Sequence, residues 1–226
     1  MGNVDWNEIR KRMKAYDYPE NHSFDPDTLQ STGRSVSRVK ALTEILTGVG
    51  LSGRLLDVGC NRGWFTFTFG CFLFASESWF SHIVGIDPIG ECIGIAEDIR
   101  SAHDFPTVEF KHVRFEQYDG TEPFNTVHFG QCAHYLFRDC VRRGEHPLKF
   151  LDKAKDLALR HILIDGAFDG DPSVEYDAKA DRWAPEIKKL ATIEGYATAL
   201  RPEFKLIKYA RSGDASTRYM AVFERI

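Results

Sequence analysis

The sequence predicts an α/β fold: a doubly wound, seven-stranded, mostly parallel sheet that ends in an antiparallel hairpin and is preceded by a helical lid. Short, largely apolar runs, such as "HIVGID", alternate with segments of helical spacing. Strands that are apolar on both faces belong to parallel sheets covered on both sides. Near the end of the chain, two strand-like runs are joined by the polar link "GDAS", which is typical of a hairpin. The 226 residues suffice for one well-filled domain and are short for two.

The first 50 residues are expected to form the lid and to select the substrate. Helical spacing covers residues 4–16 and 35–48, and a segment rich in turn formers lies between them. The core follows over residues 51–226 of the same domain. Its predicted strands cover 53–59, 82–87, 107–115, 125–131, 161–167, 203–212 and 217–226. Its predicted helices cover 63–77, 88–102, 147–160 and 184–195.

The composition is that of a soluble globular protein, with 43% hydrophobic and 27% charged residues. The net charge of -4 provides no broad positive field for nucleic acid or anionic lipid. The five cysteines form no C-x-x-C pair, which favours free, mostly buried thiols over a disulfide framework or a zinc site. The N-terminus lacks the apolar region of a secretory signal, and polar residues interrupt the most apolar window, so a cytoplasmic location without membrane contact is expected.

The stretch "RLLDVGCNRGWFTF", residues 54–67, is the first specific functional signal. An apolar strand ends in Asp57, and Gly59, Asn61 and Gly63 alternate before the next helix. In a doubly wound sheet, ligands bind beyond the carboxyl ends of the strands, where glycines let the backbone approach them and a helix N-terminus offers unpaired N–H groups. The dinucleotide pattern G-x-G-x-x-G is not met, which disfavours a dehydrogenase.

The segment "LLDVGCNRGWFTF" resembles the first motif, D/E-x-G-x-G-x-G, of the Rossmann-like (class I) S-adenosylmethionine-dependent methyltransferases. Asn61 replaces the middle glycine, and Asn also adopts positive φ. The resemblance implies that the backbone from Gly59 through Cys60 and Asn61 to Gly63 cradles the methionine part of S-adenosyl-L-methionine. It also implies that Asp57 organises the loop and the amino end of the cofactor.

The second predicted strand ends in Asp87, followed by Pro88. A carboxylate at this position accepts hydrogen bonds from ribose hydroxyls, and in the family the matching acid binds the adenosyl ribose. The alternative is that Asp87 is a turn or N-cap residue. Pro88 at a first helical position suits both interpretations.

The ends of the third and fourth strands supply the next candidates. The segment from "RFEQYDG" onward is similar to the tRNA wobble-uridine carboxymethyltransferases, a branch of the same superfamily, and this implies that Phe115 and Glu116 flank the adenine. The alternative is an apolar strand end followed by a solvated acid. At "FGQCAHYLF" the superfamily places residues near the transferred methyl group, so Gln131 is a cofactor-binding candidate and His134 a candidate base for a substrate hydroxyl. Equally, His134 could pack on the cofactor or cap the next turn.

Two charged groups complete the candidates. The acidic run over 165–181 contains oxygen ligands of the kind that hold magnesium or calcium, but it lacks the EF-hand spacing and such runs are usually solvated, so no metal site is predicted. Asp165, at the end of the fifth strand, is the acid expected to face the cleft. Basic clusters on helices are normally solvated faces, but if the N-terminal segment folds over the strand ends, four arginines could hold a phosphate or carboxylate of the substrate. They are Arg34, Arg38, Arg142 and Arg143.

Together these patterns predict an S-adenosylmethionine-dependent methyltransferase that acts on a small molecule or sugar, at oxygen. The acidic net charge and the absence of the N-P-P-Y motif of amino-DNA methyltransferases favour that acceptor. A tRNA base is the second candidate acceptor. A non-catalytic cofactor-binding protein of the same fold is the alternative from another class.

Overall fold

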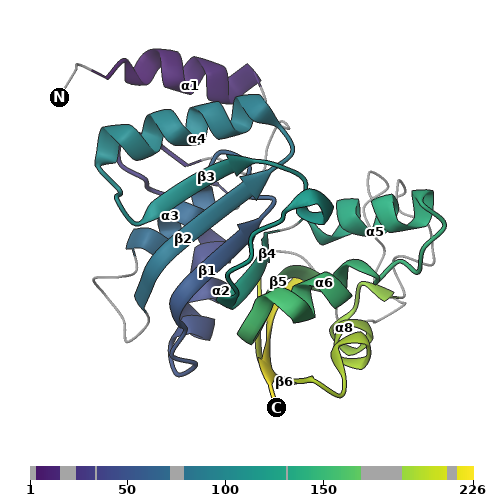
Figure 1. The fold of residues 1–226 in the computed structure, drawn as a ribbon. Helices are drawn as coiled ribbons and strands as arrows, with labels where there is room; N and C mark the ends of the chain where they lie inside the picture. Colours follow the sequence, from purple (N-terminus) through teal and green to yellow (C-terminus); the bar gives the residue numbers. More distant parts are fainter. Residues whose placement is uncertain are drawn as a thin grey trace.

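The computed structural model describes residues 4–15, 24–33, 35–71, 79–130, 132–168, 190–212 and 218–226. Its centre is one seven-stranded sheet with the strand order β3-β2-β1-β4-β5-β7-β6 (Figure 1). The strands are β1 (Ser52–Val58), β2 (Trp79–Asp87), β3 (Val108–His112), β4 (Phe124–Gly130), β5 (Ala158–Phe168), β6 (Phe204–Arg211) and β7 (Arg218–Arg225). The first five pair in parallel, and β7 is antiparallel to both β5 and β6. The predicted fold class is confirmed, with the last strand inserted between β5 and β6.

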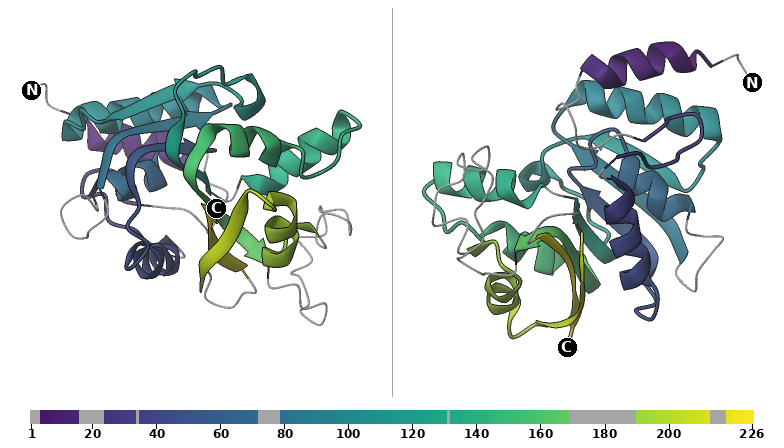
Figure 2. Two further views of the ribbon diagram at one scale, coloured as in Figure 1. Left: turned by 60° about the horizontal axis from the view of Figure 1, so that its bottom comes forward. Right: turned by 180° about the vertical axis from the view of Figure 1, so that it is seen from behind.

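Helices cover both faces of the sheet, as the two views of Figure 2 show. One face carries α1 (Trp6–Ala15), α2 (Ser35–Leu46), α3 (Trp64–Cys71) and α4 (Gly90–His103). The other carries α5 (Ala133–Arg142), α6 (Phe150–Leu157) and α8 (Ile193–Leu200). Each layer buries its own apolar cluster against the sheet. The largely apolar strands are therefore explained by burial on both faces.

Two of the helix boundaries that differ from the sequence prediction have a clear structural reason. The helix predicted over 147–160 ends at Leu157, because Ala158 already pairs with Phe124 of β4. The last helix begins at Ile193, where the Thr192 hydroxyl accepts a hydrogen bond from the Gly195 N–H and caps the first turn. Part of the helix predicted over 184–195 lies outside the described residues.

The segment after β3 also differs from its prediction. The strand predicted over 107–115 ends at His112, and Phe115–Gln117 form a single 3-10 turn, η2. Phe115 points into the core, where its ring packs edge-on against Phe129 at a centroid distance of 5.4 Å. The helix α5, for which the sequence supplied no boundaries, follows β4 directly.

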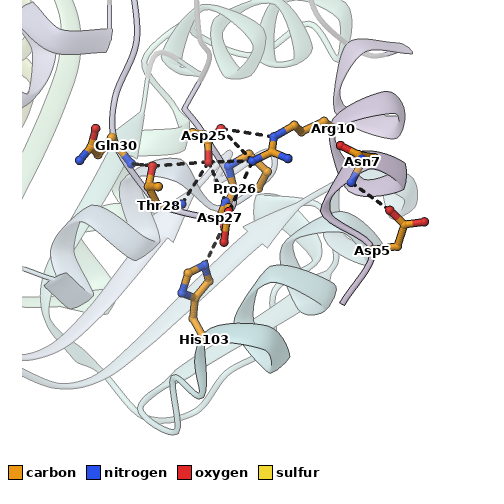
Figure 3. A network of polar contacts seen from close by, with 9 residues as sticks. All are labelled: Asp5, Asn7, Arg10, Asp25, Pro26, Asp27, Thr28, Gln30 and His103. Carbon is orange, nitrogen blue, oxygen red and sulfur yellow. Dashed lines mark hydrogen bonds and ion pairs between the residues drawn. The ribbon is translucent and has the colours of Figure 1, made fainter. Parts of the chain in front are cut away.

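The N-terminal segment is attached to the sheet through α4, along which α1 lies (Figures 1 and 2). Figure 3 shows the polar contacts of this attachment. The guanidinium of Arg10 donates to the Asp25 carboxylate, which also accepts the N–H groups of Asp27 and Thr28 and so closes a turn. His103 at the end of α4 lies 2.7 Å from the Pro26 carbonyl oxygen through its Nε2. In the described residues α1 therefore sits on the flank formed by α4, while the lid remains a prediction.

None of the helices that the structure describes is long and apolar enough to cross a membrane.

Candidate functional site

Strand register aligns four residues at the carboxyl edge of the sheet. Val58 of β1 pairs with Ile86 of β2 and with Phe129 of β4, so the next residue, Gly59, lies between Asp87 and Gly130. Gly130 in turn pairs with Asp165 of β5. We call Asp87, Gly59, Gly130 and Asp165 the edge row. It places one carboxylate on each side of two glycines.

Both carboxylates of the edge row point to the same face of the sheet. Alternate residues of a strand share a face. Leu163, two residues before Asp165, and Ile83, four before Asp87, both belong to the apolar cluster under α1–α4. The site is therefore built on the side covered by the N-terminal helices.

The loop after β1 has the backbone that the motif predicts. Gly59, Asn61 and Gly63 have φ values of 70°, 52° and 81°, so Asn61 adopts the left-handed conformation expected where a glycine is more common. The N–H groups of Gly59 and Cys60 both donate to the Ile86 carbonyl at 2.8 and 3.0 Å, which fixes the loop against β2.

Neighbouring side chains explain why the loop needs glycine at its two ends. A Cβ on Gly59 would lie 2.4 Å from the Cβ of Cys132, and a Cβ on Gly63 would lie 2.7 Å from the rings of Phe67 and Phe110. The space that these glycines leave is thus filled by protein. The close approach to a ligand proposed from the sequence must use the backbone of the loop.

Asp87 is held by backbone donors. Its Oδ2 accepts the N–H of Asn61 at 3.0 Å and its Oδ1 accepts the N–H of Ile89 at 2.9 Å. Burial raises the pKa of Asp87, and the two N–H donors offset part of that rise. A carboxylate offers about four lone-pair sites, so two are left for ribose hydroxyls. Pro88 is exposed and precedes the N-cap residue Ile89, so it stands before the helix and not at its first position.

Asp57 is completely buried and its carboxylate is used by the protein. Its Oδ1 lies 2.8 Å from Nδ1 of His128 on β4, and its Oδ2 accepts the Thr66 hydroxyl of α3 at 2.6 Å. Asp57 therefore ties β1 to β4 and to the helix after the loop. These contacts fit the sequence interpretation that Asp57 organises the loop. The effect of Asp57 on the amino end of the cofactor remains a prediction. The partners His128 and Thr66 were missed because neither belongs to a recognisable motif.

Arg62, also missed, links the loop to the N-terminal helix. It is buried, and its Nη1 donates to the Met13 carbonyl of α1 at 2.7 Å. The end of α1 is thereby fixed next to the loop that follows β1.

The adenine candidates lie at η2. Phe115 is buried, whereas Glu116 is exposed and lies 3.5 Å from the guanidinium of Arg143. A cleft of about 370 Å³ opens beside both residues, between η2, α5 and α6. Their contact with adenine stays a prediction. Gln131 lies outside the described residues.

His134 lies in the first turn of α5, four residues beyond Gly130 of the edge row. Its side chain is half-buried, and its ring centroid lies 3.9 Å from that of the exposed Tyr135. Cys132, between β4 and α5, donates its thiol to the Val58 carbonyl oxygen at 3.0 Å and so holds this turn against β1. The position next to the sheet edge is the one expected for a group near the transferred methyl, and the role of His134 stays a prediction.

The structure joins two candidates that the sequence named separately. Arg38 of α2 and Asp165 of β5 form a buried ion pair in which Nε lies 2.7 Å from Oδ2 and Nη2 also donates to Oδ2. Arg142 pairs with Asp139 at 3.7 Å on the surface, and Arg143 pairs with Glu145 at 2.8 Å. Arg38 therefore reaches the carboxyl edge of the sheet, whereas Arg142 and Arg143 pair with acids elsewhere. Arg34 lies outside the described residues.

All five cysteines are free, and three of them are fully buried, as predicted. The acids of the 165–181 run beyond Asp165 lie outside the described residues. Within the part of the chain that the structure describes, no cluster of three or more His, Cys, Asp or Glu side chains could hold a metal ion.

Comparison with known proteins identifies the family and the fold. Residues 30–157 match the family described as "Methyltransferase domain". No curated protein matches the sequence at a significant level. The fold is similar to that of the N-methyltransferase NodS of Bradyrhizobium japonicum in complex with S-adenosyl-L-homocysteine, with 14% identity, 99% of both chains covered and a TM-score of 0.61.

Two further solved structures show the same fold. For the magnesium protoporphyrin IX methyltransferase of Synechocystis with bound S-adenosyl-L-homocysteine, the identity is 13%, the coverage 100% of this chain and 90% of that one, and the TM-score 0.56. For an S-adenosylmethionine-dependent methyltransferase of Aquifex aeolicus, the identity is 15%, the coverage 90% and 100%, and the TM-score 0.56. The match spans more than half of the chain and includes the loop after β1, so this protein belongs to the class I S-adenosylmethionine-dependent methyltransferases.

Proposed function

We propose that this methyltransferase transfers the methyl group of S-adenosylmethionine to a hydroxyl oxygen of a small molecule or sugar. The observation that carries the proposal is the half-buried His134 at the start of α5, directly after β4. A neutral imidazole at that place can take the proton that a hydroxyl must lose, because the ordinary pKa of histidine lies near working pH.

The cofactor supplies an activated methyl group, so the chain mainly has to bind and align the two reactants. Asp87 suits the ribose hydroxyls, because its carboxylate is fixed by the N–H groups of Asn61 and Ile89 and keeps lone pairs free. Next to Asp87, the loop of residues 59–63 is fixed against β2, and the buried Asp57 ties β1 to β4 and α3. His134, in the first turn of α5 beyond β4, is then the candidate base for the acceptor.

The acceptor class is supported by charge and by the similar structures. The net charge of -4 gives no general attraction to a polyanion such as tRNA. One similar structure is a methyltransferase for magnesium protoporphyrin IX, which is a small molecule. The similarity to an enzyme named an N-methyltransferase makes a nitrogen acceptor the competing outcome.

The test is methyl transfer from labelled S-adenosylmethionine to a matched panel of phenols, sugar alcohols and their amine counterparts, with bulk tRNA as a further acceptor. We expect label in the hydroxyl compounds. His134→Gln should lower kcat by about 100-fold or more without weakening S-adenosylhomocysteine binding. Tyr135→Phe is the matched control and should retain activity.

Transfer confined to amines or to tRNA would contradict the proposed acceptor. Tight binding of S-adenosylhomocysteine without turnover on any acceptor would instead favour a non-catalytic cofactor-binding protein.

A further inference from the structure

The two carboxylates of the edge row differ in how completely they are used. Asp87 accepts a backbone N–H on each oxygen. Asp165 is 0% exposed, and two nitrogens of Arg38, Nε and Nη2, donate to the same oxygen, Oδ2. The other oxygen, Oδ1, is buried and has no hydrogen-bond partner within the described chain.

Burying a carboxylate oxygen without a hydrogen-bond partner costs free energy, so we expect a donor that the chain itself does not provide. Because the carboxylate of Asp165 is ion-paired with Arg38, Oδ1 is available as a hydrogen-bond acceptor. The pair is also rigid, because the guanidinium lies over the rings of Trp64 and Phe65, at 4.8 and 4.3 Å from their centroids. Oδ1 is thus a fixed, negatively polarised acceptor at the sheet edge.

The spacing of the edge row fits the length of the cofactor. Asp87 and Asp165 stand on strands separated by β1 and β4, and three strand spacings amount to about 14 Å. Seven bonds separate the hydroxyl-bearing ribose carbon of the cofactor from its α-amino nitrogen, an extended reach of about 8 Å. A hydrogen bond of about 2.9 Å at each end fills the remaining distance. A cofactor whose ribose is held by Asp87 therefore extends its amino-acid end toward β5.

We propose that Asp165 is a cofactor-binding residue whose Oδ1 accepts a hydrogen bond from the α-ammonium group of S-adenosylmethionine, with Arg38 as its positioning residue. The inference deepens the cofactor site of the proposed function. An ammonium ion supplies the donor that Oδ1 lacks, and a charged donor strengthens the bond. The amino-acid end of the cofactor carries its own carboxylate, so this end, taken by itself, adds no net charge beside the ion pair. Because Oδ1 is enclosed, cofactor entry has to displace the groups around it.

The test combines a change in the protein with a change in the ligand. Calorimetry would measure the binding of S-adenosylhomocysteine and of its desamino analogue, in which hydrogen replaces the α-amino group. Asp165→Asn should weaken S-adenosylhomocysteine by about tenfold or more and leave the analogue within about twofold. Asp87→Asn should weaken both ligands equally, because both carry the ribose.

Thr126→Val is the matched control. Among the described residues, the Thr126 hydroxyl is also buried without a hydrogen-bond partner, but it stands four residues before Gly130 on β4, about 13 Å from the edge row. Its replacement should change neither affinity.

The proposal is overturned if Asp165→Asn weakens both ligands equally or weakens neither. If this variant does not fold, the wild-type protein still decides the matter: an analogue that binds as tightly as S-adenosylhomocysteine excludes an ammonium contact. Failure of wild-type protein to bind S-adenosylhomocysteine at all would contradict the cofactor site itself, which is a different result.

Discussion

Asp87 and Asp165 occupy equivalent places at the ends of two strands, yet the chain holds them in different ways. Asp87 is fixed by backbone N–H groups from its own loop and from the loop after β1. Asp165 is fixed by the side chain of Arg38, which lies 127 positions earlier in the sequence. The first arrangement follows from a local strand-loop-helix pattern. The second exists only once α2 has packed against the far half of the sheet.

This difference separates a site that tolerates side-chain changes from one that does not. Backbone donors persist when neighbouring residues are replaced, whereas the ion pair disappears with either partner. The predictions below test that contrast, beginning with the largest expected effect.

Arg38→Met should lower the free energy of unfolding by about 3–5 kcal/mol, because it leaves the buried carboxylate of Asp165 without its counter-charge. Urea unfolding measures the loss. The double variant Arg38→Met/Asp165→Leu should recover most of it, since both charges are then gone. Arg142→Met, at an exposed ion pair, is the control and should change stability by about 0.5 kcal/mol or less. A loss of unfolding free energy below about 1 kcal/mol for Arg38→Met would show that the ion pair does not hold α2 against β5.

Gly59→Ala should cost about 2–4 kcal/mol of unfolding free energy. Its positive φ disfavours any side chain by about 1–2 kcal/mol, and the new Cβ collides with Cys132. Gly33→Ala is the matched control, because Gly33 also has positive φ but no atom of the described residues lies within 4 Å of an added Cβ. The difference between the two variants measures the collision alone, and Cys132→Gly should remove it. Equal losses at both glycines would refute the tight packing at the loop.

The affinity for S-adenosylhomocysteine should fall on acidification at a higher pH than the ordinary aspartate pKa would give. Burial raises the pKa of Asp87, and the ribose hydroxyls donate to its ionised form. The affinity for S-adenosylhomocysteine is therefore at its maximum above the pKa of Asp87. Below that pKa it falls by about tenfold for each further pH unit. Calorimetry between pH 7 and pH 4 measures the profile, and Asp87→Asn should flatten it. A wild-type profile that is flat over this range would argue against ribose binding by Asp87.

Arg12→Ala should have the smallest effect, about 1 kcal/mol or less. Arg12 of α1 pairs with Glu91 and Asp98 of α4 at 2.9 and 2.6 Å, and water screens this partly exposed network. Thermal unfolding at low and high salt measures it, and the effect should shrink with salt. A loss as large as that of Arg38→Met would erase the distinction between the two ion pairs.

The sequence predicted the parts of the site that are contiguous in the chain. The alternation from Asp57 to Gly63 specified both the loop and its left-handed Asn61, and the apolar run before Asp87 located the neighbouring strand end. The mostly parallel sheet with helices on both faces followed from the alternation of apolar strands and helices.

Side-chain partners across the sheet could not be predicted in the same way. Nothing near Asp57 identifies His128 as its partner on β4, and nothing near Asp165 identifies Arg38. Such pairs depend on strand register and helix packing, which a single sequence does not encode locally. The predicted end of the helix over 147–160 was wrong for a related reason. Ala158 pairs with β4, and this strand pairing overrides the helical spacing of the residues before it.

The most direct test of the account is a crystal structure of the protein with S-adenosylhomocysteine. We predict that the ribose hydroxyls lie within hydrogen-bond distance of the Asp87 carboxylate and that the ligand crosses the edge row beside Gly59 and Gly130. A nucleoside bound elsewhere, or one whose ribose makes no contact with Asp87, would contradict it.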